Sequence, residues 1–299
     1  MSSAETSSTT KRHGVLVGVD GSPASRVAVD WAARDAELRD LPLTVVYVMP
    51  AEATAMWVEL PPTPEFWRAR DNRADVILTE ALGWVEDAIS ESPSIAVSHR
   101  RVSAAVIPAL IDMSKDADTV VVGCRGLGGV QGLLLGSVSA ALIHHAQCTV
   151  VVVHDEDPLI PDPSRAPVVV GIDGSPASER AVELGFDEAS RRGVDLVAVH
   201  VWTDNTDDTD DYRAELGDWA HQSLAERLAG WTERYPDVTV HRVVEKDKPA
   251  RRLLDHAAKA QLLVVGSHGR GGFARMLLGS VSTAVVHGAR MPVMVARSA

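Results

Sequence analysis

The sequence has little of what several common protein classes need. It holds two cysteines in 299 residues, 4% aromatic residues and a formal net charge of −12. Two cysteines cannot form a framework of disulfides, so we expect a reducing compartment. Acidic residues are in excess and there is no long basic stripe, which argues against binding to duplex nucleic acid or to an anionic membrane.

Long apolar runs are also absent. No run approaches the roughly 20 residues that a membrane-spanning helix needs. The opening residues, MSSAET, lack the basic-then-apolar pattern of a signal peptide. We therefore expect a cytoplasmic protein with neither a membrane nor a nucleic acid among its partners. Residues 1–13 are rich in Ser and Thr, and we predict that they form a disordered tail.

What the sequence does have is one unit used twice. The run VLVGVDGSPAS from Val15 returns as VVVGIDGSPAS from Val168, and the glycine segment at Gly123 returns at Gly266. Matching residues are 153 positions apart in the first pair and 143 in the second, so the first copy is the longer one. The length suits two domains, each with its own core.

The domain boundaries follow from this repeat. Residues 155–166 are charged and interrupted by proline, which is typical of a linker. We predict one domain at residues 14–154 and a second at residues 167–299.

Strand-like apolar runs alternate with helical periodicity in each copy. The predicted strands of the first copy are Val15–Val19, Leu43–Val48, Ile95–Val97 with Val102, Thr119–Val122 and Thr149–Val153. After a first helix that begins at Pro23, the predicted helices are Glu65–Ile89, Ile107–Lys115 and Ser137–His145. Several strands are apolar throughout, as expected when both faces are covered. This alternation predicts two doubly wound α/β domains with parallel strands.

The first helix carries the clearest start signal. Ser22 is a candidate N-cap, and Pro23 occupies the first helical position. The apolar stripe predicted for this helix consists of Val27, Trp31 and Leu38, with Asp35 as its interruption.

Glycine-rich segments follow the strand ends, where a doubly wound sheet binds its ligands. Gly123 ends an apolar strand, and Gly136-Ser137 opens a helix after a glycine-rich loop that starts at Gly126. Glycines let the backbone approach a ligand or adopt positive φ, and the free N–H groups of a helix start favour an anion such as phosphate. Such loops also occur as simple turns. The same spacing recurs in the second copy, which favours two phosphate-binding loops.

An acidic residue ends the first strand of each copy. Asp20 and Asp173 lie at the sheet edge where the glycines gather, and a carboxylate there can accept hydrogen bonds from ribose hydroxyls. Alternatively, Asp20 caps the following turn together with Ser22. The two roles are compatible.

The spacing Gly, two residues, Gly, nine residues and Gly-Ser, which starts at Gly123 and again at Gly266, resembles the ATP-binding motif of universal stress proteins. The resemblance covers nearly all of both copies and is to a tandem member. It implies one five-stranded parallel sheet per copy, with ATP at the ends of the first, second and fourth strands and Mg²⁺ or Mn²⁺ on its phosphates. It also implies a homodimer and a role in stress or dormancy adaptation and growth control.

The resemblance assigns binding residues by position. Asp20 and Asp173 would meet ribose or adenine, and Val48 and Val201 would offer backbone groups to adenine. The residues implied to hold ribose and phosphates are Gly123, Gly126, Gly136, Ser137 and Val138 in the first copy, and Gly266, Gly269, Gly279, Ser280 and Val281 in the second. The departures from the family pattern are Cys124, His268 and Thr149, and none of them removes a motif glycine.

Motifs of other catalytic sites are absent from the sequence. It contains no Gly-x-x-x-x-Gly-Lys-Ser/Thr loop, no Gly-x-Ser-x-Gly elbow and no His-Glu-x-x-His helix. The adjacent pair His144-His145 cannot chelate a metal as two histidines four residues apart could. We therefore assign neither a catalytic residue nor a protein metal site, and predict that the chain is not an enzyme, with weak ATPase activity as an alternative.

Four further features each allow two interpretations. Cys124 is either a redox-sensitive thiol or, like Cys148, a buried inert one, and the second is favoured. The acidic run 204–211 lacks the glycine of a calcium loop and is interpreted as a solvated loop. The stretch 57–67 predicts a lid over the nucleotide or a packing element. The basic pair Arg251-Arg252 is interpreted as charge balance on a helix.

We expect from these features an ATP-binding regulatory protein. ATP would order the glycine loop and change a surface that an unidentified protein partner recognises. The alternatives are a slow ATPase or nucleotidyl transferase, a scaffold without nucleotide, and a cyclic-AMP sensor. The apolar terminal strands Val150–Val153 and Val293–Val295 are expected to pair between the two domains.

Overall fold

The computed structural model describes residues 13–49, 63–89, 95–127, 135–154, 163–202, 210–269 and 278–297, with the side chains of 163 and 210–218 left out. Residues 1–12 of the predicted tail and 155–162 of the predicted linker lie outside the described residues. His13, the last residue of the predicted tail, is buried, and its N–H donates to the carbonyl of Asp116 at 2.9 Å. His13 therefore belongs with the folded domain.

Each half contributes five strands and four helices to the described structure. The first half contains β1 (Gly14–Gly18), α1 (Pro23–Arg39), β2 (Leu43–Met49), α2 (Pro64–Ala88), β3 (Val97–Ser103), α3 (Val106–Met113), β4 (Ala117–Gly123), α4 (Ser137–His145) and β5 (Thr149–Val153). The second half contains β6 (Val168–Gly171), α5 (Pro176–Arg192), β7 (Leu196–Trp202), α6 (Asp210–Arg234), β8 (Val240–Lys246), α7 (Pro249–Ala257), β9 (Leu262–Gly266), α8 (Ser280–Gly288) and β10 (Val293–Ala296).

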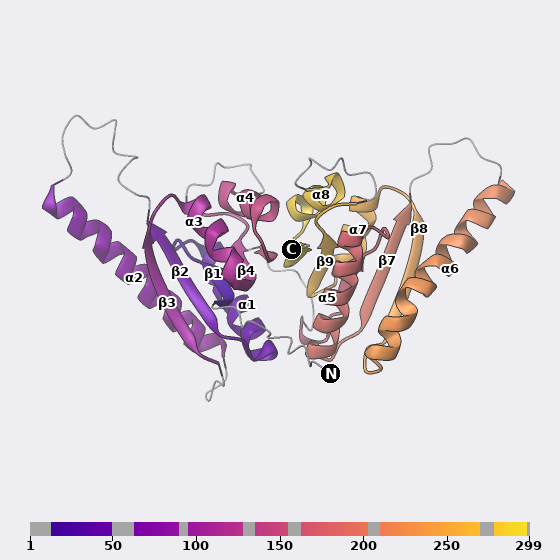
Figure 1. The fold of residues 1–299 in the computed structure, drawn as a ribbon, viewed down its shortest axis with the longest axis horizontal. Helices are drawn as coiled ribbons and strands as arrows, with labels where there is room; N and C mark the ends of the chain where they lie inside the picture. Colours follow the sequence, from indigo (N-terminus) through magenta and orange to yellow (C-terminus); the bar gives the residue numbers. More distant parts are fainter. Residues whose placement is uncertain are drawn as a thin grey trace, which may run out of the picture.

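All ten strands belong to one sheet, in the order β3-β2-β1-β4-β5-β10-β9-β6-β7-β8. The strands within each half pair in parallel, which confirms the predicted five-stranded parallel arrangement. β5 and β10 pair antiparallel, with Val151 opposite Met294, so the terminal strands join the halves as predicted. Figure 1 shows the halves side by side, with α2 and α6 at the outer ends and α4 and α8 near the centre.

Helices cover both faces of the sheet, which explains the uninterrupted apolar strands. Apolar residues of α1, α2, α5 and α6 pack on one face, and those of α3, α4, α7 and α8 pack on the other. Val15 and Val17 of β1 point to the first face and Leu16 to the second, in keeping with the alternation of strand side chains.

The edge strands β3 and β8 differ from the buried strands. His99, Arg100 and Arg101 of β3 and His241 and Arg242 of β8 are exposed. The sequence predicted β3 only as Ile95–Val97 with Val102, because an edge strand with one solvated face has few apolar residues to mark it.

Helix α1 begins as predicted, but it buries a different face. The Oγ of Ser22 accepts a hydrogen bond from the N–H of Ser25 at 3.2 Å, and Pro23 is the first helical residue. Val27 and Leu38 of the predicted stripe are 38% and 41% exposed, so that part of the prediction is wrong. The buried face of α1 is instead largely alanine, namely Ala24, Ala28, Ala32, Ala33 and Ala36. Small side chains let the helix lie close to the sheet, and a search for large apolar residues overlooks them.

Asp35, the interruption of that stripe, lies in a buried group of four charges between α1 and α5. Its carboxylate is 3.0 Å from Nε of Arg39 and 3.3 Å from Nη2 of Arg192, while Arg192 is 2.8 Å from Glu188 and Arg39 also pairs with Glu188. These side chains are at most 12% exposed. Burial and then the charge of Glu188 raise the pKa of Asp35 to about 6, against the opposing effect of the two arginines.

The four charges repeat the symmetry of the chain. Asp35 and Arg39 occupy in α1 the positions of Glu188 and Arg192 in α5, and each arginine contacts both carboxylates. A buried carboxylate without its partner is strongly destabilising. The pairing therefore ties the two domains together on this face of the sheet.

We predict that Arg192→Ala lowers the free energy of unfolding by about 3–5 kcal/mol, because it leaves two buried carboxylates with one cation. The matched control is Arg34→Ala, which removes an exposed pair with Asp30 at the same four-residue spacing and should change stability by less than about 1 kcal/mol. Chemical denaturation monitored by circular dichroism measures both values. Equal effects of the two substitutions would contradict this account of the junction.

A second prediction concerns pH. The pKa of Asp35 in the folded protein lies above its ordinary value of 3.8. The stability that this carboxyl contributes is therefore present below pH 3.8 and is lost as the pH rises through about 6. Asp35→Asn lacks this component. Its free energy of unfolding should therefore rise relative to that of the unchanged protein as the pH increases from 3.8 to about 6. A difference that does not vary with pH would contradict the raised pKa.

Candidate functional site

A cavity of about 430 Å³ opens at the carboxyl ends of β1, β2 and β4. β1 is followed along the chain by its neighbour β2, whereas β4 lies on its other side, so the strand order reverses at this point. In doubly wound sheets this is where a crevice forms, because successive crossovers leave in opposite directions. The cavity volume lies in the range typical of small-molecule sites.

All of the residues predicted for the first site lie around this cavity. They are Asp20, Val48, Gly123, Gly126, Gly136, Ser137 and Val138. They come from β1, β2, β4, the segment after β4 and the start of α4, which are far apart in the sequence. The glycine spacing, the strand-end rule and the positions assigned by the family resemblance thus all point to this cavity.

Asp20 fastens the turn after β1 to the segment after β4. Its Oδ1 accepts the N–H of Ser22 and its Oδ2 accepts the N–H of Leu127, each at 2.9 Å. The capping interpretation of Asp20 is therefore confirmed. In the same place, the Oγ of Ser22 lies 3.5 Å from the carbonyl of Arg125. The start of α1 and the segment after β4 are thus held against each other.

The motif glycines are needed for space. A Cβ on Gly123 would lie 2.8 Å from the backbone of Ala24, and a Cβ on Gly126 would overlap the Oδ2 of Asp20. Among the described glycines, positive φ occurs at Gly21 and three other positions, none of which is in the motif. Close approach, and not positive φ, is therefore what the described motif glycines require.

The start of α4 presents an anion-binding end to the cavity. Gly136 is the N-cap and provides no side-chain hydrogen bond to the helix. The first N–H groups of a helix have no partner within the helix and carry partial positive charge. Ser137, at the first helical position, lines the cavity with its hydroxyl. Ser139 secures this end by donating its hydroxyl to the carbonyl of Cys124 at 3.0 Å.

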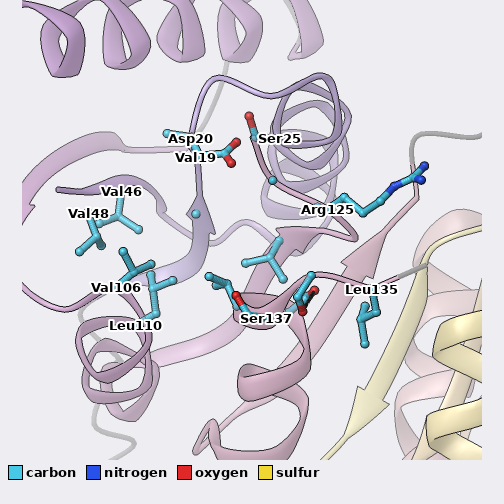
Figure 2. A pocket seen from close by; sticks show the side chains of 17 residues that line it. Val19, Asp20, Ser25, Val46, Val48, Val106, Leu110, Arg125, Leu135 and Ser137 are labelled. Atoms are coloured by element: carbon cyan, nitrogen blue, oxygen red, sulfur yellow. Dashed lines mark hydrogen bonds between the residues drawn. The ribbon is translucent and has the colours of Figure 1, made fainter. Parts of the chain in front are cut away.

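The opposite wall of the cavity is apolar. Figure 2 shows Val46, Val48, Val106 and Leu110 gathered on one side, and Asp20 and Arg125 on the other. Such a division suits a ligand with a flat apolar ring at one end and a polar, anionic tail at the other. Of these lining residues, the site prediction missed Val46, Val106, Leu110 and Arg125.

The missed residues did carry signals. Val46 lies two residues before Val48 on β2 and therefore faces the same side of the sheet. Val106 and Leu110 are four residues apart, so they share a face of α3. The sequence does not show that this face of α3 lies toward the edge of the sheet where the cavity opens.

The second copy repeats the same contacts. The Oδ1 of Asp173 accepts the N–H of Ser175 at 2.9 Å, and a Cβ on Gly269 would lie 2.6 Å from Asp173 Oδ2. A Cβ on Gly266 would lie 2.7 Å from the backbone of Ala177. The remaining predicted residues lie on the equivalent elements: Val201 on β7, Gly279 as N-cap, and Ser280 and Val281 at the start of α8.

Parts of both predicted loops lie outside the described residues, namely 128–134 and 270–277. The same holds for residues 57–62 of the predicted lid and for 204–209 of the acidic run, while residues 210 and 211 begin α6. From Pro64 the predicted lid is helix α2, where Phe66 and Trp67 meet edge to face with ring centroids 5.3 Å apart.

The other singled-out residues have structural roles in the described part of the chain. Cys124 and Cys148 are buried, at 1% and 5% exposed, as the favoured interpretation predicted. Arg252 pairs with Glu245 and with Asp255, which agrees with charge balance. The hydrogen bond from Arg252, assisted by His256, lowers the pKa of Glu245 to about 2.

Within the described residues, neither a metal site nor a membrane span is found. No group of three or more His, Cys, Asp or Glu side chains there is arranged to hold a metal ion. His144 and His145 occupy the last turn of α4. No described helix is both long and apolar enough to cross a membrane.

We predict that Gly123→Ala destabilises the fold by about 1–3 kcal/mol, because the added Cβ would overlap the start of α1. The control is Gly83→Ala in α2, where the new Cβ meets nothing within 4 Å. It should stabilise the protein by about 0.5–1 kcal/mol, since Ala is the better helix former. Thermal unfolding of both variants measures the contrast, and a neutral Gly123→Ala would contradict the close approach.

Comparison with known proteins agrees with this geometry. The model of the universal stress protein family matches residues 11–154 and again residues 165–297. A universal stress protein of Mycobacterium tuberculosis strain H37Rv is 51% identical over 295 residues, which cover 95% of this chain and 96% of the relative. A universal stress protein of Mycolicibacterium smegmatis is 50% identical over 290 residues, covering 95% and 97%.

The fold has a counterpart among solved structures. A universal stress protein from Archaeoglobus fulgidus has a TM-score of 0.68 to this chain at 22% identity, with 95% of this chain and 96% of that chain covered. The family model matches the sequence twice, and the structure contains two copies of one fold. The relatives are about 50% identical over 96–97% of their length. The chain belongs to the universal stress protein family and carries two of its domains in tandem.

Proposed function

We propose that this protein is an ATP-binding regulator in which each domain holds one nucleotide. The observation that carries the proposal is the cavity at the β1–β4 reversal, with its apolar wall at one end and a helix start at the other. Adenine would lie against Val46 and Val48, near backbone groups at the end of β2. The phosphates would meet the N–H groups of α4 and the hydroxyl of Ser137.

Asp20 links ligand binding to the loop. Its two oxygens already accept N–H groups of Ser22 and Leu127. Each carboxylate oxygen has a second lone pair that can accept a ribose hydroxyl. A nucleotide would thus bind beside the contact that joins the start of α1 to the segment after β4. This geometry supports a nucleotide-dependent switch, because binding there biases the position of the loop that follows Leu127.

A divalent cation would arrive with the nucleotide. Among the described residues that line the cavity, Asp20 is the one carboxylate, and both of its oxygens accept backbone N–H groups. These residues do not make a protein metal site. Mg²⁺ commonly binds through phosphate oxygens and water, with few protein ligands. We propose that Mg²⁺ or Mn²⁺ is held by the triphosphate.

The described residues offer weak support for catalysis. Arg125 lines the first cavity, and His268 takes its place in the second copy. Among the described residues that line the first cavity, no second carboxylate stands beside Asp20 to serve as a general base. The proposed role is therefore binding and regulation of growth under stress, in the cytoplasm and through a protein partner, with weak ATPase activity as the alternative. A homodimer is part of the proposal, and light scattering on the purified chain tests it.

We predict that the purified protein binds two ATP molecules per chain in isothermal titration calorimetry. Gly126→Val combined with Gly269→Val should weaken binding at least about tenfold, because each branched side chain intrudes on the aspartate beside the loop. Gly230→Val is the control, since a Cβ there meets nothing within 4 Å. Mass spectrometry of nucleotide released on denaturation identifies the natural ligand. Release of cyclic AMP would favour the cyclic-AMP sensor. Absence of bound nucleotide together with absence of ATP binding would favour the scaffold. Turnover of ATP at enzyme-like rates would favour the enzyme.

A further inference from the structure

Two basic side chains cross the junction between the domains at equivalent positions. His154 follows β5, and Arg297 follows β10. The Nε2 of His154 lies 3.0 Å from the carbonyl oxygen of Val286, and its Nδ1 lies 3.1 Å from that of Met291. Arg297 donates from Nη1 to the carbonyl of Ile143 at 2.5 Å. Each domain therefore reaches into the other with the residue after its last strand.

The carbonyls of Ile143 and Val286 belong to the last turns of α4 and α8, and that of Met291 follows α8. The last four carbonyls of a helix have no partner within it. In α4, the carbonyl of Leu142 accepts the N–H of Ala146, and in α8, that of Val285 accepts the N–H of Ala289, each at 2.9 Å. Ile143 and Val286 come next, and their carbonyls are capped from the other domain. A cation is favoured at this end of a helix dipole.

The geometry at His154 sets its charge. A neutral imidazole has one N–H donor and one nitrogen that can only accept. A carbonyl oxygen cannot donate, so both contacts are hydrogen bonds only when both ring nitrogens carry protons. The residue is 8% exposed, which leaves little room for water to take the place of either carbonyl. The two contacts therefore describe an imidazolium.

The ionisable groups on the same face as His154 are mostly basic. Val150 and Val152 pack on the α4–α8 face of the sheet, so His154, two residues on, faces the same side. On α4, α8 and the neighbouring strand ends, the ionisable residues are His144, His145, His287, Arg290, Arg297, Cys124, Arg125 and His268. The helices α3 and α7 of the same face add Asp112, Arg251, Arg252, Asp255 and His256. The chain continues from His154 into Asp155, which lies outside the described residues.

These groups interact across the junction. Partial burial, then His145, Arg297 and His268, lower the pKa of His144. The two carbonyls and the end of the α8 dipole support a positive charge on His154. That makes the charge sensitive to pH, since imidazole ionises between about pH 5 and pH 8 whereas guanidinium stays charged.

We propose that His154 is a positioning residue for the second nucleotide site, acting through α8 in its protonated form. This inference rests on the proposed function. Val286 lies six residues after Ser280 in α8, so the capped carbonyl and the phosphate-binding start of the helix are only about 9 Å apart. Loss of a proton from His154 turns one hydrogen bond into a repulsive contact and loosens the helix. Arg297 holds α4, and with it the first site, at every physiological pH.

The test measures the two sites separately in the full chain. Gly126→Val blocks the first site, so ATP binding then reports on the second. Gly269→Val blocks the second site, so ATP binding then reports on the first. Between about pH 5.5 and pH 8, ATP affinity of the second site should fall about three- to tenfold more than that of the first, which is the effect of one hydrogen bond. Comparing the sites cancels the ionisation of ATP itself, because both receive the same ligand.

Two exchanges of the capping residues serve as matched variants. His154→Arg should remove the excess pH dependence from the second site, and Arg297→His should confer it on the first. Equal pH profiles in all of these proteins would overturn the positioning role. Retention of the excess pH dependence in His154→Arg would overturn it too.

The charge on His154 has its own measurement. In protein labelled with ¹⁵N at histidine, the His154 signals are identified by their loss in His154→Arg. Both ring nitrogens should show protonated shifts at about pH 6. One unprotonated nitrogen there would overturn the imidazolium. Failure of the unchanged protein to bind ATP would instead overturn the proposed function and the positioning role with it, while this spectrum still decides the charge of His154.

Discussion

The structure depends on the antiparallel pairing of β5 with β10. Each of these strands is the last of its domain, and each would be an open, apolar sheet edge in an isolated copy. Pairing them satisfies both rows of backbone groups and turns two five-stranded sheets into one of ten strands. It also sets the geometry of everything at the centre. Because the pairing is antiparallel, the two halves are related by an approximate twofold rotation, which places equivalent elements opposite one another on both faces of the sheet.

The two faces of the junction use charge in different ways. On the α1–α5 face, Asp35 and Glu188 share two arginines in a buried group that is neutral as a whole when both carboxylates are ionised. On the α4–α8 face, single cations meet helix carbonyls, and the ionisable residues around them are mostly basic. The first arrangement holds the domains together through paired charges, and the second fastens the helices that begin at the two candidate sites.

Much of this architecture could be predicted from the sequence because glycine and proline report directly on backbone geometry. Pro23 marked the start of α1, and the motif glycines marked the strand ends, since any Cβ at Gly123 would overlap the neighbouring helix. Other parts could not be predicted. The buried face of α1 is made of alanines, whose burial depends on how closely the helix approaches the sheet. The partners of Asp35 lie on another domain, and a local pattern of hydropathy contains no information about contacts at that separation.

The outer strands have a consequence for how copies of this chain can meet. β3 and β8 close the ten-stranded sheet, and basic side chains such as Arg100 and Arg242 stand exposed along them. Like charges facing each other across a growing ladder would repel, so neither border invites a further strand from a neighbouring molecule. Pairing of strands between domains is thus confined to β5 and β10, which the tandem arrangement brings together within one chain. Self-association would have to proceed through helical surfaces, and open-ended polymerisation through the sheet is disfavoured.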